Sequence, residues 1–323
     1  MGKTIGDIGE FGLIEFIRDR LGEQGLIVDV GDDAAVVATN PGDFVVATVD
    51  DIVQDVHFTL DYPPRSVGWR AIASSSSDIA AMGGKARFFL ISLVAPEETT
   101  FSWFRRFLSG ATDFARRFNL ALVGGNISNG DSIRVSTTTL GTIPPGHIKR
   151  RCGAKVGDII YLTGAIGGSQ AGRIIFSETK NPRLRLAKRH LFPVPRLVEG
   201  KILGAVFAVS AMIDISDGFL QDLGHILTNS DVGAYIDIDD IPLFPGVDRF
   251  CRERGLEPIE FALSSGEEYE LIFTAEEKYA SGIEEEIGEE KVIPIGEIVA
   301  KKGIFAKRGG KLIKFPQAGW RHF

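Results

Sequence analysis

Cysteine, long apolar runs and positive charge are all scarce in this sequence of 323 residues. Its two cysteines, Cys152 and Cys251, are too few for a disulfide-stapled domain or a four-cysteine zinc site. The longest nearly unbroken apolar stretch, Phe88 to Ala95, is far shorter than the roughly 20 residues that cross a bilayer, and the N-terminus shows no charged-then-apolar signal pattern. We therefore expect a cytoplasmic protein with no membrane contact.

The charge balance is negative, with 36 Lys and Arg against 43 Asp and Glu and a formal net charge of −7. Nonspecific nucleic-acid binding depends on basic side chains that neutralise phosphates, so we expect no nucleic-acid partner. Hydrophobic residues at 44% and charged residues at 24% are typical of globular proteins, and roughly 150 residues per domain indicates two domains. An acidic protein suits small anionic ligands that arrive with metal ions.

Strand and helix patterns alternate along the chain, which predicts an α/β protein whose N-terminal half is α+β. A basic cluster follows the break at Pro144-Pro145-Gly146, and we place the boundary there, giving domains 1–147 and 148–323. In the first domain, the expected helices are 13–21, 69–82 and 104–118, and the expected strands are 34–38, 44–49, 88–95, 120–123 and 133–140. In the second, the expected strands are 159–163, 212–215, 235–238, 271–274 and 292–295.

Aspartates gather at the ends of predicted strands rather than along solvated faces. If even half of them converge, cations must offset their repulsion, and oxygen ligands without a histidine–cysteine set favour Mg²⁺, Mn²⁺ or Ca²⁺ over zinc. The alternative for any single aspartate is that it caps a helix or closes a turn. The group consists of Asp32, Asp33, Asp50, Asp51, Asp55, Asp78, Asp214 and Asp217.

Asp78 is the only charged residue between Ala71 and Gly84, in a helix otherwise made of small and apolar residues. Neither face of this helix is polar enough to be exposed, and an unpaired buried carboxylate costs several kcal/mol. We therefore expect Asp78 to face a metal, with backbone amides or an arginine as the alternative partners. The small neighbours, including Ser74 to Ser77, would let a bulky polyanion approach closely.

A second motif, Asp214-Ile215-Ser216-Asp217-Gly218, lies between an apolar strand and a helical pattern. Two carboxylates at this junction can hold metal and phosphate over free backbone amides, whereas a simple helix cap by Ser216 or Asp217 is the alternative. Turns predicted at Gly124-Gly125-Asn126 and at Gly164 to Gly168 would let backbone N–H groups approach phosphates, although plain tight turns are common.

Three more charged or titratable positions complete the candidates. Arg151, in the basic cluster, is the best candidate to pair with phosphate oxygens. His57 lies among the acidic turns, where a lone histidine is more often structural, and Glu267 belongs to a second acidic group before a strand. The Walker A pattern, the protein-kinase motifs, the Gly-x-Ser-x-Gly elbow and the zinc HExxH pair are all absent from the sequence.

Together these motifs resemble the thiamine-monophosphate kinase family, within the superfamily that contains aminoimidazole ribonucleotide synthetase. The resemblance implies a two-domain aminoimidazole ribonucleotide synthetase-like fold and a homodimer whose N-terminal sheets pair. It also implies ATP-dependent phosphorylation of thiamine monophosphate to thiamine diphosphate with several Mg²⁺ ions. The matching segments are Gly9-Glu10-Phe11, Gly31-Asp32-Asp33-Ala34, Val56-His57-Phe58, Ser77 to Gly83, Gly124-Gly125-Asn126, Gly153-Ala154-Lys155, Asp214 to Gly218, Gly266-Glu267 and Gly319-Trp320.

The same resemblance assigns roles to individual residues. The implied metal ligands are Asp33, Thr48, Val49 through its backbone, Asp50, Asp78, Asn126, Asp214 and Asp217. The implied ATP contacts are Gly125, Asn126, Arg151 and Ser216, the substrate contacts are His57, Glu267 and Trp320, and the catalytic residues are Asp78, Asp214, Asp217 and Arg151. The indole of Trp320 suits a cationic thiazolium. Asn126, Ser265 and Glu268 depart from the family pattern, which usually has Asp, Gly and Asp there.

The expected reaction needs no general base, because a phosphate-monoester acceptor has a second pKa of about 6 and is largely deprotonated at pH 7. We therefore expect direct in-line transfer without a phosphoenzyme. The alternatives are another ATP-using enzyme of the superfamily, such as a purine-intermediate synthetase, and a catalytically silent nucleotide-binding dimer. A hydrogenase maturation factor is disfavoured, since we expect such a factor to carry a C-terminal cysteine and this sequence ends Arg321-His322-Phe323.

Overall fold

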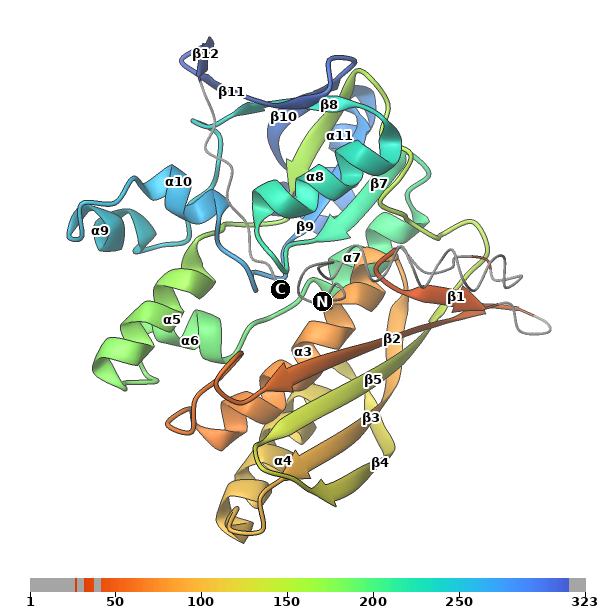
Figure 1. Ribbon diagram of the computed structural model, residues 1–323. Helices are drawn as coiled ribbons and strands as arrows, with labels where there is room; N and C mark the ends of the chain where they lie inside the picture. Colours follow the sequence, from red (N-terminus) through yellow and green to blue (C-terminus); the bar gives the residue numbers. More distant parts are fainter. Residues whose placement is uncertain (1–26, 28–31, 38–41, 314–323) are drawn as a thin grey trace, which may run out of the picture.

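The computed structural model describes residues 27, 32–37 and 42–313. Within them the chain forms two sheets, one in each half, with helices packed against both (Figure 1). This is the α/β architecture with an α+β N-terminal half that the sequence predicts. The helix expected at 13–21 and the segments around Gly9, Gly31 and Trp320 lie outside the described residues.

The N-terminal sheet has the strand order β1-β2-β5-β3-β4 and carries its helices on one face (Figure 1). Neighbouring strands are antiparallel except for β3 and β4, which are parallel. Buried side chains alternate along β5, so that Thr137 and Thr139 face the helices. The elements are β1 (Ala35–Val37), β2 (Phe44–Val53), α3 (Pro64–Ala81), β3 (Lys85–Ala95), α4 (Phe101–Phe118), β4 (Ala121–Asn129) and β5 (Arg134–Ile143).

Helix α3 is the central element, because it packs against the N-terminal sheet, against α4, and against the C-terminal half. It begins with a proline, which suits the first helical position, and 15 of its 18 residues are buried. The crossing with α4 is close: a Cβ on Gly68 would lie 2.0 Å from the Phe107 carbonyl oxygen, and one on Gly110 would lie 1.8 Å from that of Arg65.

The C-terminal sheet has the order β12-β11-β8-β10-β6-β9-β7 and is antiparallel except between β11 and β8. One of its faces forms a core of Ile, Leu and Ala side chains with α8. The strands are β6 (Asp158–Leu162), β7 (Val209–Asp214), β8 (Gly233–Asp237), β9 (Leu271–Glu276), β10 (Ile293–Val299), β11 (Gly303–Arg308) and β12 (Lys311–Ile313). The helices are α5 (Gly168–Thr179), α6 (Arg185–Leu191), α7 (Leu197–Ala205), α8 (Phe219–Ser230), α9 (Val247–Arg252), α10 (Pro258–Leu263) and α11 (Ala280–Ile287), with 3₁₀ turns at Glu277–Tyr279 and Glu289–Lys291.

Two expectations about strand ends are wrong. Strand β2 continues to Val53, so Asp50 and Asp51 lie inside it rather than after it. Strand β4 runs through Gly124-Gly125-Asn126, which therefore form no turn. The turn predicted at Gly164 to Gly168 does precede a helix, α5. None of the helices in the described part of the chain is both long and apolar enough to cross a bilayer.

Candidate active site

Three carboxylates from distant parts of the chain converge where the two halves meet. Asp33 precedes β1, Asp78 lies on α3 and Asp214 ends β7, and one carboxylate oxygen from each lies within 4.8 Å of the others. The side chains supply hard oxygen ligands only, which is the donor set that Mg²⁺ prefers in proteins. The convergence that the sequence predicts for these three aspartates is therefore present, and its donor set fits a divalent cation.

Burial makes two of these carboxylates, those of Asp78 and Asp214, hard to ionise. It raises the pKa of Asp214 to about 7, and the nearby Asp33 carboxylate adds to the effect. Burial, and after it the carboxylates of Asp214 and Asp50, raises the pKa of Asp78 well above its ordinary value. Two hydroxyls compensate in part, because Thr48 donates to Asp78 at 2.7 Å and Ser77 donates to Asp214 at 2.5 Å. A bound cation would favour the ionised forms.

Arg151 lies at the edge of this aspartate cluster. Its guanidinium donates to both oxygens of Asp33, with an Nη2–Oδ1 distance of 2.8 Å and an Nε–Oδ2 distance of 3.2 Å. Its backbone N–H donates to Asp32 at 3.3 Å, and burial, with Asp33 adding to it, raises the pKa of the Asp32 carboxyl to about 6. In this structure the guanidinium of Arg151 therefore pairs with a carboxylate. Its pairing with phosphate oxygens stays a prediction.

Strand β2 presents its predicted ligands to two different sides. Thr48 and Asp50 face α3, where Thr48 donates to Asp78 and Ser74 lies close enough to Asp50 to lower its pKa. Burial raises the pKa of Asp50, although Ser74 and the Asp51 N–H, which donates at 2.8 Å, oppose the rise. Val49 lies between them on the opposite face and is 65% exposed. The structure therefore places Thr48 and Asp50 beside the aspartate cluster, while the backbone role of Val49 stays a prediction.

Gly125 and Asn126 do not reach the aspartate cluster of their own chain. Gly125 on β4 pairs with Ile91 on β3, Ile91 pairs with Thr137 on β5, and Thr137 pairs with Asp50 on β2. Three strand spacings therefore separate Gly125 from Asp50. At roughly 4.8 Å per strand this is about 14 Å. Both residues lie on β4, the edge strand, where every residue is exposed.

The loop between β7 and α8 is organised by Asp222, which the sequence analysis did not single out. The Oδ2 atom of Asp222 accepts hydrogen bonds from the N–H groups of Ser216, Asp217 and Gly218 at 3.1, 3.2 and 3.1 Å. Neither Ser216 nor Asp217 caps α8, so the cap interpretation is wrong; the Asp217 carboxylate instead accepts from Gln221 at 2.9 Å. Ser216 lies in this loop beside the cluster, and its ATP contact stays a prediction.

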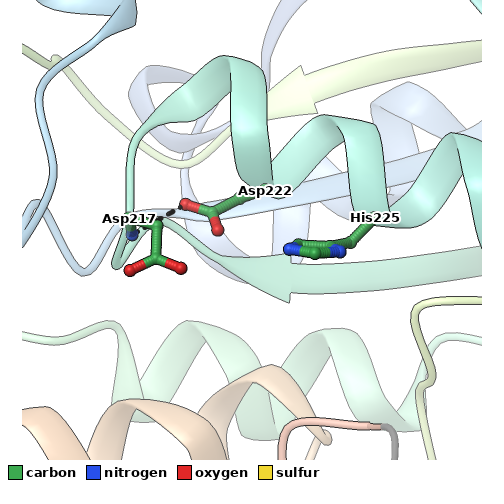
Figure 2. Close-up of side chains that lie close together, drawn as sticks. All are labelled: Asp217, Asp222 and His225. Carbon is green, nitrogen blue, oxygen red and sulfur yellow. Dashed lines mark hydrogen bonds between the residues drawn. The ribbon is translucent and has the colours of Figure 1, made fainter. Parts of the chain in front are cut away.

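Asp217, Asp222 and His225 form a second group that could hold a cation, with ligand atoms within 4.8 Å of one another (Figure 2). Burial, with the Arg151 charge, lowers the pKa of His225 to about 4, so its imidazole is neutral and able to ligate. The signal in the sequence is the spacing of Asp222 and His225, three residues apart on one helix directly after the Asp214–Gly218 motif.

The two predicted substrate residues within the described chain, His57 and Glu267, are joined by Arg70 of α3. Arg70 donates through Nη1 to the His57 carbonyl at 2.7 Å and forms an ion pair through Nη2 with Glu267. The Val53 N–H donates to Nδ1 of His57 at 3.0 Å, so the neutral imidazole carries its proton on Nε2. Trp320, the third predicted substrate contact, lies outside the described residues.

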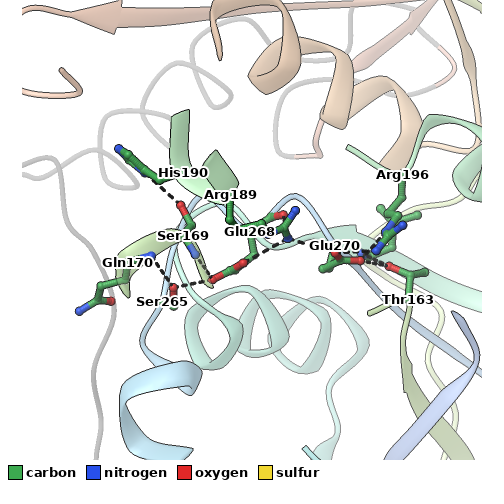
Figure 3. Close-up of polar contacts among 10 residues, drawn as sticks. Thr163, Ser169, Gln170, Arg189, His190, Arg196, Ser265, Glu268 and Glu270 are labelled. Carbon is green, nitrogen blue, oxygen red and sulfur yellow. Dashed lines mark hydrogen bonds and ion pairs between the residues drawn. The ribbon is translucent and has the colours of Figure 1, made fainter. Parts of the chain in front are cut away.

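The remaining acidic residues of the 266–270 segment belong to a buried network rather than to the site (Figure 3). Glu270 pairs with Arg189 and Arg196, and Glu268 pairs with Arg189. Ser265 donates to Glu268 at 2.7 Å, so two of the departures from the family pattern contact each other. These departures therefore form one internal hydrogen bond and do not alter the aspartate cluster.

Comparisons with known proteins identify the family of this chain. The family model for the AIR synthase related protein N-terminal domain matches residues 31–143, and that for the C-terminal domain matches residues 155–308. The thiamine-monophosphate kinase of Aquifex aeolicus (strain VF5) is 33% identical over 98% of this chain and 99% of that protein. That of Salmonella typhimurium (strain LT2) is 33% identical over 98% of both chains.

Solved structures give the same result. AaThiL complexed with AMPPCP and TMP superposes with a TM-score of 0.88 at 32% identity and covers 100% of both chains. The hydrogenase maturation protein HypE of E. coli has a TM-score of 0.70 at 21% identity over 85% of this chain and 87% of its own, which shows a shared fold alone. On its sequence and its structure, this chain belongs to the thiamine-monophosphate kinase family of the AIR synthase related proteins.

Proposed function

We propose that the protein transfers the γ-phosphoryl group of ATP to thiamine monophosphate and so forms thiamine diphosphate. The observation that carries the proposal is the full-length similarity, at 32% identity, to AaThiL complexed with AMPPCP and TMP, an ATP analogue and thiamine monophosphate. The converging aspartates support it, because a transfer between two polyanions requires cations that offset their repulsion.

In this proposal the chain's own residues position and neutralise rather than exchange protons. Asp33, Asp78 and Asp214, with Thr48, Asp50 and Asp217 beside them, would hold Mg²⁺, which when bound would neutralise charge on the phosphates. Arg151 exchanges its bidentate contact with Asp33 for phosphate oxygens, since a guanidinium fits either anion. The acceptor phosphate is itself the nucleophile, so the transfer is direct and in line.

The activity test is an incubation of the purified protein with ATP, Mg²⁺ and, in parallel, thiamine monophosphate, thiamine and purine intermediates. We expect ADP and thiamine diphosphate with thiamine monophosphate alone. ADP formed with a purine intermediate instead would assign another activity of the superfamily. ATP binding without ADP formation would identify a catalytically silent protein. A phosphorylated protein formed from ATP alone, and turning over competently, would contradict direct transfer.

We further propose that the active form is a homodimer in which the N-terminal sheets of the two chains pair. Two observations support this: the sheet face opposite α3 carries exposed apolar side chains such as Val49 and Phe88, and the edge strand β4 exposes Leu122, Val123 and Ile127. Since Gly125 and Asn126 lie about 14 Å from Asp50 of their own chain, at roughly 4.8 Å per strand spacing, the dimer assigns them to the partner's nucleotide site.

A further inference from the structure

One face of α3 carries a polar stripe that the proposed mechanism does not fully use. Arg70, Ser74, Ser77 and Asp78 follow one another at spacings of four, three and one residue, which places them on one side of the helix. Each lies against a different part of the site: Ser74 lies beside Asp50, Ser77 bonds to Asp214, and Asp78 bonds to Thr48. Arg70 is the member that reaches the substrate side.

Arg70 is a fully buried charge with two specific partners. Its side chain is 1% exposed, and it donates to the His57 carbonyl at 2.7 Å and pairs with the Glu267 carboxylate. Its Nε has no hydrogen-bond partner among the described residues. Burying a charged arginine this deeply destabilises the folded state unless its hydrogen-bond partners are held in place around it. The contacts therefore hold Arg70, the His57 carbonyl and the Glu267 carboxylate in fixed positions.

The loop that carries Glu267 needs such an anchor. Glu267 and Tyr269 both have left-handed backbone conformations, with φ of 55° and 52°, which side-chain-bearing residues rarely adopt. The backbone N–H of Glu267 donates to the Ser216 carbonyl at 2.7 Å, and that of Tyr269 donates to the Ile215 carbonyl at 2.8 Å. The loop is therefore tied to the Asp214–Gly218 loop by its backbone and to α3 by Arg70.

The carboxylate of Glu267 has a partner on two sides, and part of its side chain is still exposed to solvent. Arg70 binds its Oε1, while its Oε2 lies 3.6 Å from Nδ1 of His190, and 30% of the side chain remains exposed. We propose that Arg70 is a positioning residue for substrate recognition, which sets Glu267 and the His57 main chain against the thiamine end of the substrate. This inference rests on the proposed function.

The test compares two buried arginines that make the same kind of contact. Arg70→Lys removes the planar guanidinium that contacts the His57 carbonyl through Nη1 and Glu267 through Nη2. We expect the KM for thiamine monophosphate to rise about tenfold or more while the KM for ATP stays within about twofold. Arg189→Lys is the matched control, because Arg189 also binds a main-chain carbonyl and a carboxylate, those of Glu268, in the neighbouring network. We expect it to lower the melting temperature without the selective rise in KM.

A rise of both KM values together in Arg70→Lys, or an equal selective rise in Arg189→Lys, would overturn the inference. Should Arg70→Lys not fold, the double variant Arg70→Met with Glu267→Gln removes both charges. Titration calorimetry is expected to show weaker binding of thiamine monophosphate than in Glu267→Gln alone, because the His57 main chain also loses its contact, with unchanged binding of ATP. Normal binding of both ligands would again overturn the inference. Wild-type protein inactive on thiamine monophosphate would instead reject the proposed function.

Discussion

At the scale of single residues, the aspartate cluster shows a conflict between stability and function. Asp214 is buried and Asp78 is half-buried, both near other carboxylates, and the described residues hydrogen-bonded to them supply hydroxyl groups rather than a full countercharge. Groups in such surroundings destabilise a protein unless a ligand compensates them. The proposed Mg²⁺ site would account for this cluster, which folding alone does not.

The first prediction follows for Asp78→Asn. The amide can still accept the Thr48 hydrogen bond but adds no negative charge, so we expect kcat to fall about a hundredfold or more while the melting temperature of the metal-free protein is unchanged or higher. Steady-state kinetics and thermal melts measure both. Asp113→Asn on α4 is the control for charge removal away from the cluster: Asp113 pairs with Arg65 of α3, and the variant should leave kcat unchanged. A kcat equal to that of the wild type in Asp78→Asn would show that Asp78 takes no part in the active site.

The second prediction concerns pH and Mg²⁺. The pKa of Asp214 rises from 3.8 to about 7 in the folded, metal-free protein, so the folded state keeps a proton that the unfolded state has lost. This contribution to stability is complete below a pH of about 4 and is lost as the pH rises through about 7. Mg²⁺ requires the ionised carboxylates, so it should raise the melting temperature by several degrees at about pH 8 and by little at about pH 5.5.

Thermal melts with Mg²⁺ and with a chelator at the two pH values measure this difference. Asp214→Asn supplies the control, because removing the titrating group should abolish the contribution of this carboxyl to the pH dependence. An Mg²⁺ effect of equal size at both pH values in the wild type would contradict the assignment of Asp214 as a ligand.

Some of these residues could be predicted from the sequence and others could not. Asp78 was recognisable as the lone charge in a segment of small residues, because a buried charge requires a partner. Arg70 carries no such signal, since it stands one residue before that segment, and the only signal for Asp222 is its spacing of three residues from His225 on a helix that ordinarily has polar residues there. Their roles depend on contacts with Glu267 and with the 216–218 backbone, which only the tertiary structure establishes.

At the scale of secondary structure, the sequence predicted the existence of most elements but misplaced several of their ends, of which those of β2 and β4 bear on the site. Asp50 and Asp51 are weak strand formers, and Gly124 and Gly125 are typical of turns. In the structure, β2 is paired with β5 through both aspartates, and β4 is paired with β3 through both glycines. Pairing between strands overrides local preference, and single-sequence patterns contain no information about the partner strand.

The third prediction concerns the α3–α4 crossing. Gly110→Ala would place a Cβ 1.8 Å from the Arg65 carbonyl oxygen, so α4 must move away from the helix that carries the site. We expect a loss of stability of about 1–3 kcal/mol, typical of overpacking, measured by chemical denaturation. Gly224→Ala on α8 is the control, since a Cβ there meets no atom within 4 Å. A denaturation midpoint for Gly110→Ala equal to that of the wild type would show that the two helices can move apart at this crossing without loss of stability.

At the scale of the whole molecule, the site requires both halves of the chain. Asp33 and Asp78 come from the N-terminal half and Asp214 from the C-terminal half, and α3 contacts both. The α/β class and the alternation of elements followed from sequence periodicity, whereas the order of strands within each sheet did not, because it depends on contacts between distant segments. The boundary near residue 147 stays a prediction.

The fourth prediction tests the dimer. Phe88 is 46% exposed on the sheet face opposite α3, so Phe88→Lys should place a charge in the proposed interface and convert a dimer into monomers, as measured by sedimentation. Activity should fall with dissociation, because Gly125 and Asn126 would no longer reach a partner's aspartate cluster. Phe207→Lys is the control: Phe207 is 97% exposed but lies between α7 and β7, away from that sheet. A wild-type protein that sediments as a fully active monomer would contradict the proposed dimer. In such a monomer Gly125 and Asn126 on β4 would have to reach the aspartate cluster of their own chain, and the register of the sheet opposes this.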